Sequence, residues 1–166
     1  MSNLLTKTRK HENTRPDGLK THGLTALKHE NSLPTESGLK HEQNMTPFQE
    51  KLKRLMDEYV NFVYNTTRNF PKEEMYSSVS QWRRSTLSMI LNYIEGYARK
   101  KPLVQLNFLE TSFGSFKESK YLLFFSKKQE FITNQEYNTG LTLAEEIGKM
   151  LWKELSDLES SIKNGK

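Results

Sequence analysis

The stretch QWRRSTLSMILNYIEGYAR, residues 81–99, decides how this chain folds. At about 100° per residue, a helix over this stretch has a polar arc of roughly 120° and an apolar arc of roughly 200°, which is wider than the roughly 100° stripe of a simple surface helix. The polar arc holds Gln81, Arg84, Ser85, Ser88, Asn92, Glu95, Gly96 and Arg99. Because it contains no Lys and only one Glu, we interpret it as a polar seam packed against neighbouring helices. An ordinary solvated face is the alternative.

Composition limits the size of the folded core. The chain has 166 residues, of which 34% are hydrophobic, and its mean hydropathy is −0.78, so we expect part of it to lie outside any core. Cysteine is absent, which excludes disulfides and thiolate metal sites. No apolar run approaches the roughly 20 residues of a membrane span, and the first residues lack the apolar region of a signal peptide. The sequence therefore predicts a cytoplasmic protein without membrane contact.

Residues 1–45 have a composition of their own. The pattern Lys-His-Glu recurs at residues 10–12, 28–30 and 40–42, and no aromatic residue occurs before Phe48. Such a segment cannot bury enough apolar surface to offset its chain entropy, so we predict a disordered low-complexity tail. All four histidines lie in it, but their irregular spacing argues against a metal site, and we expect no cofactor. Because Met45 directly precedes a good helix start, we hypothesise that translation begins there.

Residues 46–166 carry four helical patterns. Thr46 and Pro47 suit a helix start, and this first helix should end near Phe70, ahead of Pro71. The second helix should run from Pro71 to about residue 100, the third over about 103–128, and the fourth after a loop through residues 134 and 135. Short connections then predict an all-α fold, an antiparallel up-down-up-down four-helix bundle. In the third helix Gly114 costs on the order of 1 kcal/mol relative to alanine, which we expect a closely approaching backbone to offset.

The positive charge of the chain is predicted to gather at one end of this bundle. The net charge is +5 and the isoelectric point about 9.3, which favour an acidic partner such as RNA or DNA. In the predicted topology, one pole combines the start of the first helix, the junction of the second and third, and the end of the fourth. That basic pole collects Lys51, Lys53, Arg54, Arg99, Lys100, Lys101, Lys163 and Lys166. We interpret it as a nucleic-acid-binding surface; simple solvated charge is the alternative.

The sequence contains few candidate residues for enzymatic catalysis. The region from Met45 onward has no histidine, which excludes Glu-x-x-His di-iron sites, Ser-His nucleophiles and histidine-dependent ribonuclease chemistry there. Neither a GxxxxGK[ST] loop nor a GxGxxG motif occurs. Glu95 and Glu118 are the candidates for a metal-dependent nuclease that uses carboxylates alone. Because Arg84 and Arg99 flank Glu95 on its own helix, a salt bridge is the better interpretation, and we predict a protein that is not an enzyme.

An ordered series of motifs carries a family resemblance. The motifs are Phe70-Pro71-Lys72-Glu73-Glu74-Met75-Tyr76, Ser80-Gln81-Trp82-Arg83-Arg84, Ser88, Asn92-Tyr93-Ile94-Glu95-Gly96, Arg99, and Phe108-Leu109 with Gly114-Ser115 and Glu118. Over about residues 47–162 the sequence resembles the bacterial four-helix-bundle proteins encoded in intervening sequences of 23S ribosomal RNA genes. It is also similar to the accessory Avd proteins of diversity-generating retroelements. Ile94 and Ser112 depart from the small residue and the alanine that the family usually has.

The resemblance implies a homo-oligomer, a pentameric ring, without known catalytic activity. It maps the family's residues onto Gln81, Arg84, Ser88, Asn92, Glu95 and Gly96, the polar arc described above, and so favours an architectural seam within the bundle or between subunits. In the retroelement branch it also implies nucleic-acid binding and a reverse transcriptase partner. We therefore predict a non-catalytic nucleic-acid-binding or scaffold protein. The alternative is a protein–protein interaction module, such as a reverse transcriptase accessory subunit, whose basic surface is incidental.

Overall fold

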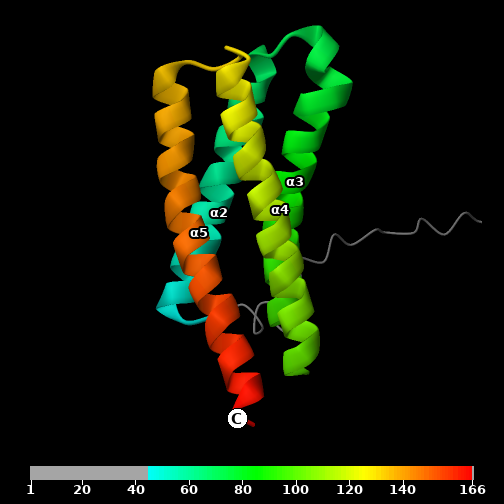
Figure 1. Ribbon diagram of the computed structural model, residues 1–166, viewed down its shortest axis with the longest axis vertical. Coiled ribbons are helices and arrows are strands. Elements are labelled where there is room, and N and C mark those ends of the chain that lie inside the picture. The colour runs from blue at the N-terminus through cyan, green and yellow to red at the C-terminus, as the bar shows by residue number, and fades with distance from the viewer. Residues whose placement is uncertain (1–44, 166) are drawn as a thin grey trace, which may run out of the picture. The chain divides into compact units, whose positions relative to one another are not determined.

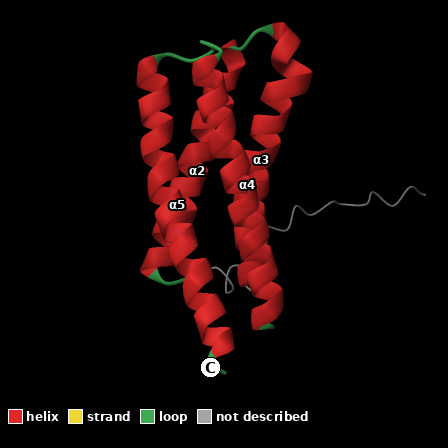
Figure 2. Ribbon diagram, viewed as in Figure 1, coloured by secondary structure: helices red, strands yellow, loops and turns green. Residues whose placement is uncertain are grey.

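The computed structural model describes residues 45–165, and these residues are almost entirely helical (Figures 1 and 2). Between residues 45 and 165 the α-helices are α2 (Pro47–Thr66), α3 (Ser80–Tyr97), α4 (Pro102–Lys128) and α5 (Asn134–Lys163). No strand occurs between residues 45 and 165, so the all-α prediction is confirmed for this part of the chain. The predicted disordered tail up to residue 44, its four histidines and Lys166 lie outside the described residues.

Each α-helix packs against two others along its length. Helix α3 contacts α4, α4 contacts α5, and α2 contacts both α3 and α5 (Figure 1). The core between them includes side chains of the four helices that are at most 1% exposed: Leu52, Met56, Tyr59, Val63, Trp82, Met89, Tyr93, Leu109, Leu123, Ala144, Ile147 and Leu151. Burial of a large apolar side chain stabilises the fold by about 1.5–3 kcal/mol, so this shared core holds the four helices together.

The start of α2 agrees with the sequence prediction. Thr46 Oγ1 accepts a hydrogen bond from the backbone N–H of Gln49 at 3.3 Å, and Gln49 Oε1 accepts one from the N–H of Thr46 at 2.8 Å. This reciprocal pair is a capping box, and Pro47 follows at the first helical position. At the other end, a 3₁₀ turn η1 (Thr67–Asn69) leads into Phe70, which is extended as expected of a residue before proline.

The prediction that the second helix begins at Pro71 is wrong in detail. A 3₁₀ turn η2 (Lys72–Glu74) and a π-helical turn η3 (Met75–Val79) precede α3, which begins only at Ser80. The cause lies in Glu74, whose carboxylate accepts hydrogen bonds from the hydroxyls of Ser77 and Ser78, both at 2.6 Å. These bonds, that of Ser77 first, lower the pKa of Glu74. Side-chain hydrogen bonds therefore replace a regular first turn.

The fourth helix begins earlier than predicted. Asn134 and Gln135 are not part of a loop, because α5 begins at Asn134. Its N-cap is Thr133, whose hydroxyl accepts from the N–H of Glu136 at 3.1 Å, while the Glu136 carboxylate accepts from the N–H of Thr133 at 2.8 Å. The chain turns just before this point through Glu130, which has a positive φ of 59°. The predicted end of α5 is confirmed, since Gly165 follows with a φ of 66°.

Small residues set the close packing of α3 on α4. Ser112 Oγ donates to the carbonyl of Met89 at 2.7 Å, and the hydroxyls of Thr86 and Ser119 lie 2.6 Å apart, all fully buried. The close approach expected at Gly114 is absent from the part of the chain that is described, because a Cβ built there meets no atom within 4 Å. The serines of α4, and not its glycine, therefore face the neighbouring helix.

Candidate functional site

The polar seam lies partly between α3 and α4. Gln81 Nε2 donates to the carboxylate of Glu118, and the hydroxyls of Ser88 and Ser115 lie 2.9 Å apart. Gly96 is buried, and a Cβ there would stand 3.2 Å from Phe108 Cβ. Asn92 donates to the carbonyl and hydroxyl of Ser88, one turn earlier on its own helix, at 2.7 and 3.1 Å. Four of the six predicted seam residues are thus buried or half-buried within one chain.

The other two seam residues face solvent. Arg84 is exposed and has no hydrogen-bond or ion-pair partner within residues 45–165. Glu95 is exposed too and pairs with Arg99, one turn later on α3. An exposed ion pair of this kind contributes little stability. Within a single chain, therefore, Arg84 and Glu95 are not buried partners.

An apolar stripe runs beside these two residues on the outer face of α3. Leu91 is 58% exposed and Ile94 42% exposed, and they share the face with half-buried Leu87 and exposed Ala98. The four positions are spaced by four, three and four residues, which is the spacing of a coiled-coil seam. The wide apolar arc read from the sequence therefore divides into a core side, with Trp82 and Tyr93, and this outer α3 stripe.

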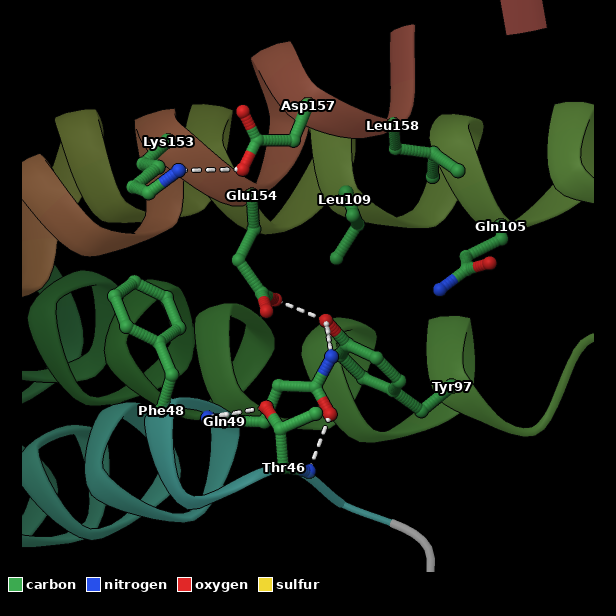
Figure 3. A pocket seen from close by; sticks show the side chains of 10 residues that line it. All are labelled: Thr46, Phe48, Gln49, Tyr97, Gln105, Leu109, Lys153, Glu154, Asp157 and Leu158. Carbon is green, nitrogen blue, oxygen red and sulfur yellow. Dashed lines mark hydrogen bonds and ion pairs between the residues drawn. The ribbon is translucent and has the colours of Figure 1, made fainter. Parts of the chain in front are cut away.

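A pocket of about 450 Å³ lies where the ends of the helices meet (Figure 3). Thr46 lines it from the start of α2, Tyr97 from the last turn of α3, Gln105 from the first turn of α4 and Leu158 from late in α5. A second pocket brings Lys101 and Leu103 together with Ile162 of α5. The structure thus gathers the helix ends that were predicted to share the basic pole.

Hydrogen bonds at the centre of this pocket join three helices. Tyr97 Oη donates to the Glu154 carboxylate and accepts from Gln49 Nε2 at 3.0 Å (Figure 3). Tyr93 donates to the same carboxylate at 3.1 Å. Burial, followed by the interaction with Glu154, raises the pKa of Tyr97, so both tyrosines keep their protons at neutral pH. This cluster was not predicted from the sequence, although Tyr93 and Tyr97, one turn apart, were a visible signal.

Carboxylates neutralise much of the predicted basic pole. The four pairs are Lys51–Glu146 at 2.5 Å, Arg54–Glu58 at 3.9 Å, Lys163–Glu159 at 2.7 Å and Arg99–Glu95. The Arg99 guanidinium also lies 4.8 Å from the ring centroid of Phe108. Lys53 is half-buried on α2, whereas Lys100 and Lys101 are exposed on the link between α3 and α4. Among the described residues of the pole, the exposed charges without an ion-pair partner are therefore those of Lys100 and Lys101 on that link.

The structure does not bring together the two carboxylates considered for nuclease chemistry. Glu118 lies beside Gln81, at the start of α3. Glu95 follows Gln81 by 14 residues, or about 21 Å along the helix axis. Within residues 45–165 there is also no group of three acidic, histidine or cysteine side chains that could hold a metal ion. Within a single chain, Glu95 and Glu118 therefore do not form a shared two-carboxylate centre.

Comparisons with known proteins give one matching family model and one structure with a similar fold. The family model described as "23S rRNA-intervening sequence protein" matches residues 50–153, which include all of α3 and α4. A crystal structure of a protein of unknown function from the S23 ribosomal protein family of Bacteroides thetaiotaomicron VPI-5482 matches with a TM-score of 0.61. The two chains are 21% identical, and the match covers 66% of this chain and 98% of that one, so it shows the fold alone. No curated protein is significantly similar.

Among residues 45–165, every helix is too short or too polar to cross a bilayer.

Proposed function

Because the chain belongs to the 23S rRNA-intervening sequence protein family, we propose that it acts as a non-catalytic, homo-oligomeric four-helix bundle that binds nucleic acid. The observation that carries this proposal is the outer α3 stripe, which leaves apolar side chains, Arg84 and Glu95 uncovered in one chain. Nucleic-acid binding is the second part of the proposal. It is supported by the exposed lysines of the α3–α4 link and by the net charge of +5.

The arrangement of the bundle is the first step of the proposal. Partner positions fall along α4 as they rise along α3: Gln81 contacts Glu118, Ser88 contacts Ser115, and Gly96 lies against Phe108. This order supports an antiparallel packing of the two helices. The short links from α3 to α4 and from α4 to α5, together with the contacts of α2 with α3 and α5, support the up-down-up-down topology.

A second copy of the chain is the proposed cover of the outer α3 stripe. Isolated exposed leucines are common on monomers, but a contiguous stripe at coiled-coil spacing marks an interaction surface. Covering it with another copy would also shield Arg84 and Glu95, so that charges of opposite sign would lie on one interface. A ring of five such copies is the assembly that the family resemblance implies.

Phosphate contacts are proposed at Lys100 and Lys101. Both are exposed, and neither has an ion-pair partner among the residues that the structure describes. Phosphates attract clustered cations, and the affinity falls as salt rises because counterions are released. Arg99 is a poorer candidate, since Glu95 and the Phe108 ring already engage its guanidinium.

Two measurements test the proposal. Light scattering coupled to gel filtration should give a mass of several chains, and Leu91→Glu should reduce that mass without loss of helical content. Labelled RNA and DNA should bind with an affinity that falls steeply with salt, and the double variant Lys100→Gln/Lys101→Gln should weaken binding. The double variant Arg68→Gln/Lys72→Gln removes two exposed charges near the start of α3 and serves as the matched control. A monomeric wild type, or no binding at low salt, would refute the corresponding part.

A protein–protein interaction module remains the second candidate function. It is favoured by the four ion pairs that neutralise the basic pole and by Tyr76, which is 95% exposed in the turn before α3. In this case the partner is another protein, such as a reverse transcriptase, and the basic surface is incidental. Absence of salt-dependent nucleic-acid binding together with a stable oligomer would favour this function.

A further inference from the structure

A groove of about 280 Å³ lies between α4 and α5, away from the pocket at the helix ends. Residues one turn apart on each helix line it: Phe113, Lys117 and Lys120 from α4, and Glu145, Lys149 and Trp152 from α5. The groove therefore combines aromatic rings with amino groups. This groove was not predicted from the sequence.

Trp152 is the most exposed ring of this groove. It is 55% exposed, but its ring packs against the ring of Phe113, with the centroids 5.3 Å apart and an angle of 46° between the planes. An indole that is fixed on one side and open on the other is a preformed surface on which a planar ring can stack.

Gly148, one turn before Trp152 on α5, lets the helix backbone lie close to Phe116 at the floor of the groove. A Cβ at this position would come within 2.9 Å of Phe116 Cζ, so the helix backbone sits directly on the Phe116 ring. The floor of the groove is consequently low between Glu145 and Trp152.

Amino groups outnumber carboxylates in the groove. Lys117, Lys120 and Lys149 line it, against Glu145 alone. Lys120 Nζ lies 2.6 Å from Glu145 Oε1, and this hydrogen bond, with help from Lys149 and Lys117, holds the pKa of Glu145 below its usual range. One carboxylate thus pairs with one lysine and leaves two positive charges beside the aromatic rings. Such a surface complements an anion that also carries a flat apolar ring.

We propose that this α4–α5 groove binds single-stranded nucleic acid, with an unpaired base stacked on Trp152 and the adjacent phosphates held by Lys117 and Lys149. Stacking on aromatic rings within a basic groove is how proteins bind single strands without reading their sequence. A duplex keeps its bases stacked on one another, so it does not offer a free base face to the indole. The inference rests on the proposed function and adds to it the class of nucleic acid and a contact site separate from Lys100 and Lys101.

Intrinsic fluorescence offers a direct test. The chain has two tryptophans, and Trp82 is fully buried, so a base can reach only Trp152. Titration of the full-length protein with a 12-nucleotide single-stranded RNA should quench the emission, and the Trp152→Phe variant should lose this quenching. The same RNA annealed into a duplex should quench little.

Variants separate the groove from the basic pole. Trp152→Ala should weaken single-strand binding by about 5- to 150-fold. Tyr121→Ala, which removes an exposed ring on α4 outside the groove, should have little effect. The double variant Lys117→Gln/Lys149→Gln should lower the salt slope for a single strand by about 1.4. Circular dichroism checks the fold of each variant. If Trp152→Ala does not fold, the lysine variant and the wild-type quenching decide.

The outcomes separate the two proposals. Absence of any nucleic-acid binding by the wild type would overturn both. Binding that is lost with Lys100→Gln/Lys101→Gln but unchanged in Trp152→Ala, without quenching, would overturn the groove and leave the proposed function standing. A change of oligomeric mass in Trp152→Ala at unchanged RNA affinity would assign the groove to a protein interface and would also overturn the inference.

Discussion

Alanine in place of Gly114 should raise the free energy of unfolding by about 1 kcal/mol. Gly114 lies in the interior of α4, and a methyl group built there meets no atom within 4 Å. Because the space is open, the substitution changes helix propensity and little else: alanine loses less backbone entropy than glycine when the helix forms. The gain should therefore approach that of a fully exposed helical position.

Gly140 in α5 provides the matched control, with the opposite sign. A Cβ there would lie 2.6 Å from Phe62 Cε1 and 2.9 Å from Leu123 Cδ1. The same gain in propensity of about 1 kcal/mol meets an overpacking cost of about 1–3 kcal/mol. Gly140→Ala should consequently lower the free energy of unfolding by up to about 2 kcal/mol. Both variants add the same methyl group to a helix, and they differ in whether neighbouring side chains already occupy the space that it needs.

Urea unfolding followed by circular dichroism, at several protein concentrations, measures both changes. The comparison is valid if the free energy of unfolding falls with urea concentration at the same slope in the wild type and in both variants. Destabilisation by Gly114→Ala, or a lower oligomeric mass of this variant, would contradict the prediction. In that case another chain approaches α4 at Gly114, and the outer face of this helix is an interface.

Three further predictions concern single side chains. Glu74→Gln should destabilise the protein at pH 7, and the difference from the wild type should shrink as the pH falls, because a carboxylate with a lowered pKa stabilises fully above its unfolded pKa and loses this contribution as the pH falls through its folded pKa; urea unfolding at a series of acid pH values checks it. Burial raises the pKa of Tyr93, so above pH 10 stability should fall by about 1.4 kcal/mol per pH unit, and Tyr93→Phe should remove this part of the slope in alkaline unfolding. Glu130→Gly should raise the melting temperature, since glycine relieves a left-handed backbone at a gain of about 0.5–1 kcal/mol.

The sequence predicts the helices well where the signal is local. Thr46 and Pro47 mark the start of α2, and Gly165 marks the end of α5, because caps depend on residues within one turn. The start of α5 was predictable on the same ground: Thr133 and Glu136 have the spacing of a capping box. The amides of Asn134 and Gln135 suggested a loop, but amides are equally acceptable in the first turn of a capped helix.

Contacts between helices account for what the sequence could not predict. The pairs Arg54–Glu58 and Glu95–Arg99 were visible as residues four apart, whereas Lys51–Glu146 depends on how α2 packs on α5. The basic pole was therefore overestimated as a free surface. The α4–α5 groove escaped notice for the same reason, because Trp152 and Lys117 come together only when the two helices are paired.

The width of the apolar arc on α3 connects the fold with the proposed assembly. A helix that only covers a core needs a stripe of roughly 100°, and the side with Trp82 and Tyr93 supplies it. The remaining arc holds Leu91 and Ile94, which gain nothing from facing water in a single chain. Their coiled-coil spacing suits a second helix, and Arg84 at its edge has no partner within residues 45–165. A second copy of the chain would give these three side chains a physical role that one chain does not offer them, and we infer from this that the single chain is only part of the functional protein.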